Sequence, residues 1–268
     1  MSGIPAPSAD RTCVVTGASS GIGAEMARVL AAEGYGVTLV ARREGPLKDL
    51  AAELGGSVRA EVVTADLSDE KSRRAILPAI EERGLVAAAL VNNAGFSTTG
   101  RIQDADPDRE LMMLRTDVEA VVDLCTLFVP GMVARGGGAI LNVASTAAFQ
   151  PIPGQAGYAA SKAFVLSYSR AIAVELKESG ITVTALCPGP VDTEFVRVAG
   201  FDEARAKSST PGFMWVPAPD VAKAGIHGML RGKGVVIPGT GNRVTAYAAI
   251  LTPKRVLLPI LAKAHPAL

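Results

Sequence analysis

Aromatic residues make up only 4% of this chain of 268 residues, and cysteines and long apolar segments are also scarce. The three cysteines, Cys13, Cys125 and Cys187, lie far apart without a CxxC pair or metal-ligand spacing, so we expect reduced thiols and no metal site. No apolar stretch reaches the ~18 residues of a spanning helix, and the first residues do not resemble a signal peptide. We therefore expect a soluble protein of the cytoplasm.

An excess of either charge is missing as well, because 27 basic residues nearly balance 26 acidic ones. This balance removes any whole-chain argument for a nucleic-acid-binding protein. However, the residues from Val221 to Leu268 include seven basic and no acidic side chains, whereas the 220 residues before them include 20 basic and 26 acidic ones. The near-neutral total therefore combines an acidic body with a basic C-terminal part.

Short apolar runs alternate along the chain with longer helical patterns. Strands are expected at 12–16, 36–41, 58–64, 87–91, 138–144, 181–187 and 235–237. Helices are expected at 22–33, 44–54, 69–83, 108–134, 156–179 and 220–230, with Pro130 kinking or ending the fourth. This alternation predicts an α/β fold, a single Rossmann-like, doubly wound domain whose parallel sheet has helices on both faces. A TIM barrel is the rival, but it would need eight strand–helix units, and only six or seven are recognised.

Three parts of the chain are expected to differ in organisation. Residues 1–9 would form a flexible lead, residues 10–238 the Rossmann-fold domain, and residues 239–268 a basic amphipathic extension. Within the domain, the irregular stretch 192–216 is long enough to act as a lid that excludes water from a substrate.

A glycine-rich turn, TGASSGIG from Thr16 to Gly23, separates the first predicted strand from the first helix. Glycines allow a tight turn and close approach to a pyrophosphate, whose charge the free N–H groups at the helix start favour. A plain turn between strand and helix is the simpler interpretation, but the position after the first strand favours nucleotide binding. No Walker Lys-Ser/Thr pair follows, which disfavours phosphoryl transfer. The candidate cofactor-binding residues are Gly17, Ser19, Ser20, Gly21, Ile22 and Gly23.

The end of the second predicted strand indicates which dinucleotide binds. Arg42 and Arg43 stand where an acidic residue would bind the ribose of NAD(H), and they can pair instead with the 2′-phosphate of NADP(H). We therefore expect NADP(H) to be preferred over NAD(H), although two arginines can also simply open a solvated helix. Asp66, followed by Leu67, is either an acceptor for the adenine amino group or a cap of the next turn.

Tyr158 and Lys162 lie four residues apart in a predicted helix, so they share one of its faces. A nearby ammonium favours the phenolate and therefore lowers the pKa of Tyr158 towards the range useful for proton transfer. Ser145 ends the fifth predicted strand, at the sheet edge where open α/β folds bind ligands. It is otherwise an ordinary serine at a strand end.

In order and spacing, these motifs resemble the short-chain dehydrogenase/reductase family over roughly residues 10–238. The resemblance is carried by TGASSGIG, the Asp66 position, NNAG at 92–95, Ser145, YAASK at 158–162 and PGPVDT at 188–193. It implies a doubly wound sheet of seven strands, a homodimer or homotetramer, and hydride transfer between NAD(P)(H) and an alcohol or carbonyl carbon.

The same resemblance implies a role for each matching residue. Tyr158 would be the general acid for carbonyl reduction or the base for alcohol oxidation. Lys162 would bind the nicotinamide ribose and lower the pKa of Tyr158, and Ser145 would bind the substrate oxygen. The further candidates for cofactor contact are Asn93, Ala94, Gly95, Pro188, Gly189, Val191 and Thr193.

One position departs from the family's pattern. The long helix usually carries an asparagine that supports a kink and a water of the proton relay, and here Asp117 stands at that position, or Thr116 if the count slips by one. A carboxylate lacks the amide donor, and beside Lys162 it would hold that lysine charged more firmly. We count Asp117 with Ser145, Tyr158 and Lys162 as a catalytic candidate and expect altered rather than abolished activity.

Apolar residues near these motifs suit a lipophilic carbonyl or secondary alcohol better than a sugar, although each of them can equally pack the core. They are Phe96, Phe149, Ile152, Pro153, Phe195, Phe213, Met214 and Trp215. For residues 239–268 three alternatives remain: packing on the body or a partner subunit, peripheral contact with an anionic membrane, or docking of an anionic carrier. The sequence predicts an NADP(H)-dependent oxidoreductase. The alternative is a catalytically weak NAD(P)-binding sensor, or a protein that docks to a membrane or partner.

Overall fold

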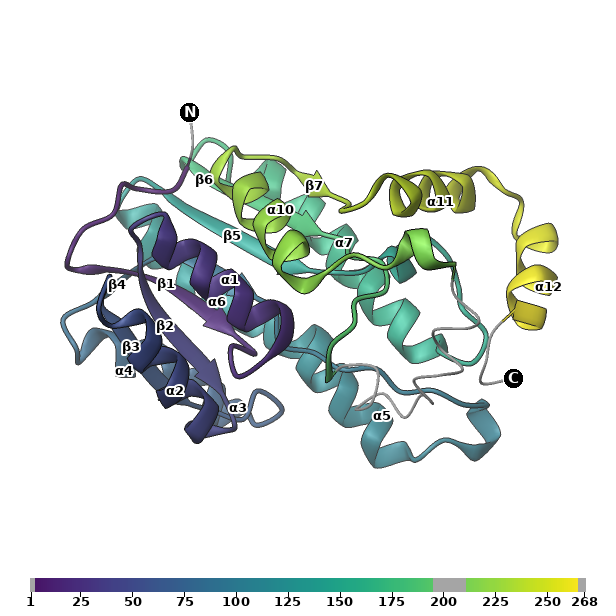
Figure 1. Ribbon diagram of the computed structural model, residues 1–268, viewed down its shortest axis with the longest axis horizontal. Coiled ribbons are helices and arrows are strands. Elements are labelled where there is room, and N and C mark those ends of the chain that lie inside the picture. Colours follow the sequence, from purple (N-terminus) through teal and green to yellow (C-terminus); the bar gives the residue numbers. More distant parts are fainter. Residues whose placement is uncertain (1–2, 195–210, 265–268) are drawn as a thin grey trace.

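Seven parallel strands form one sheet at the centre of the computed structural model, which describes residues 3–194 and 211–264 (Figure 1). The strands are β1 (Arg11–Thr16), β2 (Gly36–Ala41), β3 (Ala60–Thr64), β4 (Val86–Asn92), β5 (Gly138–Val143), β6 (Ile181–Leu186) and β7 (Val235–Val236). Their order across the sheet is β3-β2-β1-β4-β5-β6-β7, and each neighbouring pair is parallel. The predicted doubly wound α/β fold is confirmed, and the open sheet rules out the TIM barrel.

Helices cover both faces of the sheet and bury its apolar side chains in two cores. One face packs against α1 (Gly21–Ala32), α2 (Glu44–Leu54) and α10 (Ala218–Leu230), which lie in front of the sheet in Figure 1. The other face packs against α4 (Ile76–Glu81), α6 (Ala120–Ala134) and α7 (Ala156–Glu175). Because helices cover both faces, the central strands appear in the sequence as apolar runs without polar alternation.

The helix expected at 69–83 is two helices, α3 (Glu70–Arg74) and α4. Pro78 lacks an N–H group, so it cannot donate the helical hydrogen bond to the carbonyl of Arg74, and α3 ends there. Asp69 caps the start of α3, where its side chain accepts a hydrogen bond from the Ser72 N–H.

The helix expected at 108–134 is also divided, into α5 (Pro107–Leu114), the π-helical turn η2 (Arg115–Glu119) and α6. The irregular turn contains Asp117, which is fully buried. Pro130 does not end the helix, because α6 continues past it to Ala134. The chain turns instead at Gly136, whose φ of 71° lies in the left-handed region that favours glycine.

Two helices follow β7, namely α11 (Thr240–Leu251) and α12 (Lys254–Ala264), and α12 lies at one end of the molecule in Figure 1. Three short 3-10 turns complete the described structure: η1 (Ile102–Asp104), η3 (Thr146–Phe149) and η4 (Gly212–Met214). Within residues 3–194 and 211–264, none of the helices has both the length and the apolar character needed to cross a bilayer.

The strand order reverses between β1 and β4, which lie side by side in the middle of the sheet. After β1 the chain builds β2 and β3 on one side, and it then returns to place β4 on the other. Such a reversal opens a crevice at the carboxyl ends of the two strands, because their following loops diverge to opposite faces. The glycine-rich turn follows β1 and Asn93 follows β4, so both border this crevice.

Candidate active site

A cavity of about 650 Å³ lies at the carboxyl edge of the sheet. Every catalytic or cofactor-binding residue predicted from the sequence lines it, except Asp117. The lining residues among these predictions are Gly17, Ser19, Ser20, Gly21, Ile22, Gly23, Arg42, Arg43, Asp66, Leu67, Asn93, Ala94, Gly95, Ser145, Tyr158, Lys162, Pro188, Gly189, Val191 and Thr193. The fold thus gathers residues from all parts of the body into one pocket.

The glycine-rich turn needs glycine for both conformation and space. Gly17 and Gly21 have φ values of 66° and 56°, in the left-handed region. A side chain at Gly23 would place its Cβ 2.4 Å from the carbonyl oxygen of Gly17. From the neighbouring strand, Asn93 Nδ2 donates to the Thr16 carbonyl at 2.9 Å and fixes the turn against β4. The turn therefore brings the start of α1 against the cavity.

The first turn of α1 and Arg43 form a surface that fits a phosphate-bearing cofactor. Ser20, the residue before α1, makes no capping hydrogen bond with its side chain, and the first N–H groups of a helix attract anions. Arg43 Nη2 donates to Ser20 Oγ at 3.0 Å and to Ser19 Oγ at 3.2 Å. The same nitrogen lies 2.9 Å from Oε2 of Glu194, a cavity residue on the opposite side. Hydroxyls, guanidinium and helix start together match the chemistry of phosphate groups.

Asp66 caps the turn that follows it, as one of the two alternatives for this residue expects, and it also lines the cavity. Its Oδ1 accepts hydrogen bonds from Ser68 N at 2.9 Å and from Ser68 Oγ at 2.8 Å. Partial burial would raise the pKa of Asp66, but the Ser68 hydrogen bonds and the charge of Arg42 outweigh it and hold that pKa below its usual value. The carboxylate is therefore a charged acceptor at this edge of the cavity.

Helix α7 presents Tyr158 and Lys162 on one face, as their spacing predicts. Lys162 Nζ lies 5.6 Å from the centre of the Tyr158 ring and donates to the Val143 carbonyl at 3.2 Å. Ser145 precedes η3, and its Oγ accepts a hydrogen bond from Ala147 N at 3.1 Å. A hydrogen bond also links the side chains of Ser145 and Tyr158. The hydroxyl of Ser145, the phenol and the ammonium thus surround one end of the cavity.

Burial raises the pKa of Tyr158 above its usual value. The charge of Lys162 and the hydrogen bond with Ser145 act in the opposite direction, whereas the carboxylate of Asp117 adds to the increase. The sequence predicts that Lys162 lowers the pKa of Tyr158, and this contribution is present, but it does not prevail. The phenol is therefore held in its protonated, proton-donating form.

Asp117 lies behind Lys162 and does not line the cavity. Its Oδ2 is 2.8 Å from Lys162 Nζ, and its Oδ1 accepts a hydrogen bond from Phe96 N at 3.0 Å. Burial would lower the pKa of Lys162, but the Asp117 carboxylate outweighs it and raises that pKa. Gly95 lies so close that a Cβ there would be 2.9 Å from Asp117 Oδ1. Asp117 thus fixes both the lysine and the chain that follows β4.

Of the apolar residues expected around the site, Phe96, Ile152 and Trp215 line the cavity. Phe149 packs in the core instead, and Phe213 is 68% exposed. Two others, Met214 and Pro153, do not line this cavity, and Phe195 lies outside the described residues. The central part of the expected lid, residues 195–210, also lies outside them.

Several polar residues near the site are not signalled by the sequence. Gln150, Gln155 and Glu194 line the cavity from segments without a recognisable motif. Asn242, from α11, donates from Nδ2 to the Met214 carbonyl at 2.9 Å, directly before Trp215. Asn242 is fully buried, and no local sequence pattern indicates this. Within the described residues, no group of three or more His, Cys, Asp or Glu side chains is arranged to hold a metal ion.

Comparisons with known proteins agree with this geometry. A family model described as short chain dehydrogenase matches residues 11–203. Sulfoacetaldehyde reductase 2 of Chromohalobacter salexigens is 34% identical over 213 residues, which cover 78% of this chain and 84% of that protein. A putative ketoacyl reductase of Streptomyces coelicolor is 39% identical over 183 residues, covering 67% of this chain and 70% of that protein.

A solved structure shows the same arrangement over most of its length. It is that of a short-chain dehydrogenase from Sphingobium yanoikuyae in complex with NADPH, with a TM-score of 0.79 and 32% sequence identity, covering 89% of this chain and 92% of that one. The family model, the relatives and this structure all describe one kind of enzyme. The chain belongs to the short-chain dehydrogenase/reductase family and is an NAD(P)-dependent oxidoreductase.

Proposed function

We propose that the protein transfers a hydride between NADP(H) and a lipophilic carbonyl or secondary alcohol, with Tyr158 as general acid or base. The placement of Tyr158, Ser145 and Lys162 at one end of a cavity carries this proposal. Phe96, Ile152 and Trp215 line the same cavity and favour an apolar substrate. When bound, the nicotinamide supplies or accepts the hydride.

The protein's own side chains would transfer the proton and stabilise the group that loses it. In the reducing direction, the phenol of Tyr158 donates its proton to the carbonyl oxygen as negative charge develops there. The Ser145 hydroxyl donates a hydrogen bond to the same oxygen and orients the substrate. Lys162 stabilises the phenolate that remains, and Asp117 keeps the ammonium in place. The raised pKa of Tyr158 favours its role as a proton donor, and hence reduction at neutral pH.

The preference for NADP(H) over NAD(H) is part of the proposal. It is supported by the guanidinium of Arg43, which reaches the hydroxyls of Ser19 and Ser20 beside the start of α1. Other solved structures of similar proteins were determined with NADPH, among them actinorhodin polyketide ketoreductase, with 30% identity and a TM-score of 0.78. We also propose a homodimer or homotetramer, a cytoplasmic location and a lid formed by residues 192–216.

The experiment that tests the function follows NADPH oxidation with a panel of carbonyl compounds. Because relatives are named for sulfoacetaldehyde and for ketoacyl reduction, the panel pairs an anionic aldehyde with apolar ketones of increasing chain length. We expect kcat/KM to rise with apolar length. A preference for the anionic aldehyde would overturn the lipophilic substrate and leave the hydride transfer intact.

A tyrosine variant separates an enzyme from a sensor. Tyr158→Phe is expected to lower kcat by about 10²- to 10⁴-fold while NADPH binding persists, because only the proton donor is removed. Tyr247→Phe, at an exposed tyrosine outside the cavity, is the matched control and should leave kcat unchanged. Cofactor binding without turnover of any compound, and a Tyr158→Phe protein indistinguishable from the wild type, would support the catalytically weak sensor.

A further inference from the structure

The two C-terminal helices contact the body of the protein through only a narrow strip. In α11, the buried residues are Asn242, Ala246 and Ala249, which follow helical spacing along one side. In α12, none of residues 254–263 is buried. Only one side of α11 is therefore buried against the body, and most of the surface of α11 and α12 faces outwards.

This outward surface is apolar to an unusual degree. In α11, Val244, Tyr247 and Leu251 are spaced by three and four residues, so they share one face, and they are 62%, 55% and 83% exposed. In α12, Val256 and Ile260 are four residues apart and are 49% and 58% exposed. Isolated apolar side chains are common on protein surfaces, but several on one face of each of two successive helices are typical of an interaction site.

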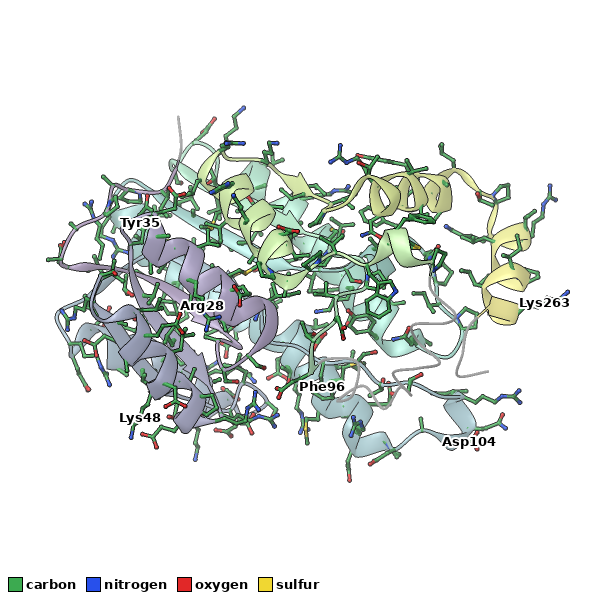
Figure 2. All side chains as sticks on the ribbon, in the orientation of Figure 1. Arg28, Tyr35, Lys48, Phe96, Asp104 and Lys263 are labelled. Carbon is green, nitrogen blue, oxygen red and sulfur yellow. The ribbon has the colours of Figure 1, made fainter. Side chains whose placement is uncertain are left out.

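The same helices carry positive charge without compensation. Arg243 and Arg255 directly precede Val244 and Val256, and Arg243, Arg255 and Lys263 are all exposed, whereas Lys254 Nζ donates to the Ala249 carbonyl. No acidic residue occurs anywhere between Val221 and Leu268. Figure 2 shows Lys263 at the outer edge of the molecule on α12, away from the sheet. An apolar face bordered by basic side chains matches the boundary between acyl chains and anionic headgroups.

We propose that α11 and α12 dock the protein onto an anionic membrane surface and lie in its plane. Their 12 and 11 residues are about 18 Å and 16 Å long at 1.5 Å per residue, well short of the ~30 Å apolar layer of a bilayer. A second copy is a poorer occupant, because two such faces placed together would bring their basic side chains into proximity. The acidic residues of the body would favour an orientation with the sheet away from the lipid.

The apolar face of α11 continues to the rim of the active-site cavity. Gly241 packs so tightly on Phe213 that a Cβ there would lie 2.4 Å from the ring, and Gly241 lies three residues before Val244 on the same side of α11. Phe213 is 68% exposed, and Trp215, two residues later, lines the cavity. Docking would therefore hold the cavity rim near the lipid, so that a lipophilic substrate could pass directly from the bilayer. This last step rests on the proposed function.

Sedimentation of the full-length protein with vesicles tests the docking. We expect binding to phosphatidylcholine vesicles containing 30% phosphatidylglycerol, little binding to phosphatidylcholine alone, and release at high salt. The double charge reversal Arg255→Glu/Lys263→Glu should weaken binding at least 10-fold. Lys223→Glu/Lys233→Glu changes net charge equally outside α11 and α12, and it should retain binding. Equal losses for both double variants, or no binding to anionic vesicles at low salt, would overturn the proposal.

The apolar face is tested separately from the charge. Tyr247→Ser/Leu251→Ser leaves the charge unchanged and should also weaken vesicle binding at least 10-fold, with unchanged NADPH oxidation on a water-soluble ketone. A concentration-dependent dimer that this variant abolishes, without any vesicle binding, would assign the face to a second copy instead. Activity on the soluble ketone tests the proposed function independently, so a failure of docking and a failure of catalysis are distinguishable.

Discussion

Asp117 and Lys162 form a buried ion pair behind the candidate active site, with Oδ2 of the aspartate 2.8 Å from Nζ of the lysine. The second oxygen, Oδ1, accepts a hydrogen bond from Phe96 N. Lys162 in turn lies beside the ring of Tyr158. A negative charge so close to the ammonium weakens its effect on the phenol, and it disfavours the phenolate directly. The pair therefore contributes, after burial, to the proton affinity of Tyr158.

The first prediction concerns the pH dependence of Asp117→Asn. Because the Asp117 carboxylate raises the pKa of Tyr158, its removal should lower that pKa. Reduction requires the protonated phenol, so its rate should decline at lower pH than in the wild type. Oxidation requires the phenolate, so its rise with pH should move in the same direction. Initial rates in both directions, followed from pH 7 up to the highest pH at which both proteins stay folded, measure these shifts, because the wild-type phenol titrates above its usual pKa. Turnover at pH 7 should be retained or increased.

A control for this variant removes a carboxylate from another ion pair. Asp123 pairs at 2.9 Å with Arg73, whose side chain is 1% exposed, and neither residue lines the cavity. Asp123→Asn is expected to lower the free energy of unfolding without moving the pH profile. If Asp117→Asn lowers turnover by about 100-fold or more, the aspartate has its own part in the chemistry and the positioning role is wrong.

The second prediction concerns cofactor choice at Arg43. Its guanidinium lies beside the hydroxyls of Ser19 and Ser20, where a 2′-phosphate would add a charge-assisted pair. Arg43→Ala should weaken NADPH binding by about 10- to 100-fold, the loss of one such hydrogen bond, and leave NADH binding nearly unchanged. Fluorescence titrations of both cofactors measure the ratio. Arg28→Ala removes an equal charge from a residue outside the cavity and serves as the control.

The partner of Arg43 gives an independent check on the same prediction. Glu194 Oε2 lies 2.9 Å from the guanidinium, so it competes with any phosphate for that charge. Glu194→Gln is therefore expected to tighten NADPH binding a few-fold without changing NADH binding. If either variant changes the affinities for NADPH and NADH equally, Arg43 does not recognise the 2′-phosphate.

Sequence alone predicts the sheet and the residues of the cavity because these depend on local patterns. Buried parallel strands appear as short apolar runs, and Gly17, Arg43 and Tyr158 lie in motifs whose spacing fits one fold. These features require no knowledge of how distant side chains meet. The order of the strands is seen only in the structure, because right-handed connections fix the face on which a crossover helix lies and not which strands are neighbours.

Features that depend on contacts between residues far apart in the chain cannot be predicted from such local patterns. The π-helical turn at Arg115–Glu119 places Asp117 against Lys162 and Phe96 N, two groups far along the chain in either direction. The net pKa of Tyr158 depends on burial, which no helix spacing reports. Similarly, the position of Asn242 follows from the packing of α11 on the η4 segment, so its local sequence gives no signal.

The third prediction concerns stability and a buried chain of polar side chains that links β4, β5 and α7. Asn92 Nδ2 donates to Asn142 Oδ1 at 2.9 Å, and Asn142 Nδ2 donates to Ser169 Oγ at 2.9 Å. Asn142→Ala leaves buried groups at both ends without their partner, so the free energy of unfolding should fall by about 2–3 kcal/mol. Urea denaturation of both proteins measures this change in the free energy of unfolding. Thr126→Ala, at an exposed threonine bonded only within its own helix, should cost far less, and equal losses would contradict the buried network.

The fourth prediction assigns a positioning role to Asn242. Its Nδ2 donates to the Met214 carbonyl at 2.9 Å and to the Pro238 carbonyl at 3.1 Å, which ties α11 to the segment carrying Trp215. Asn242→Ala should raise KM for the carbonyl substrate several-fold and lower kcat less, because the proton donor is untouched. The free energy of unfolding should fall by about 1–3 kcal/mol. Thr245→Ala, in the same helix, removes only hydrogen bonds to neighbouring carbonyls and is the control.

A second contact of Asn242 distinguishes positioning from a general loss of stability. Gly189 lies in the segment 188–193 after β6, which lines the cavity and which we propose as the cofactor loop. A Cβ at Gly189 would lie 2.3 Å from Asn242 Oδ1, so Gly189→Ala alone should weaken NADPH binding by displacing this loop. In the Asn242→Ala background the obstructing side chain is gone, and the same glycine substitution should cost much less. Neighbouring residues that share a contact show such non-additive effects, whereas independent losses of stability add. Additive effects on NADPH affinity would therefore show that Asn242 does not position the cofactor loop.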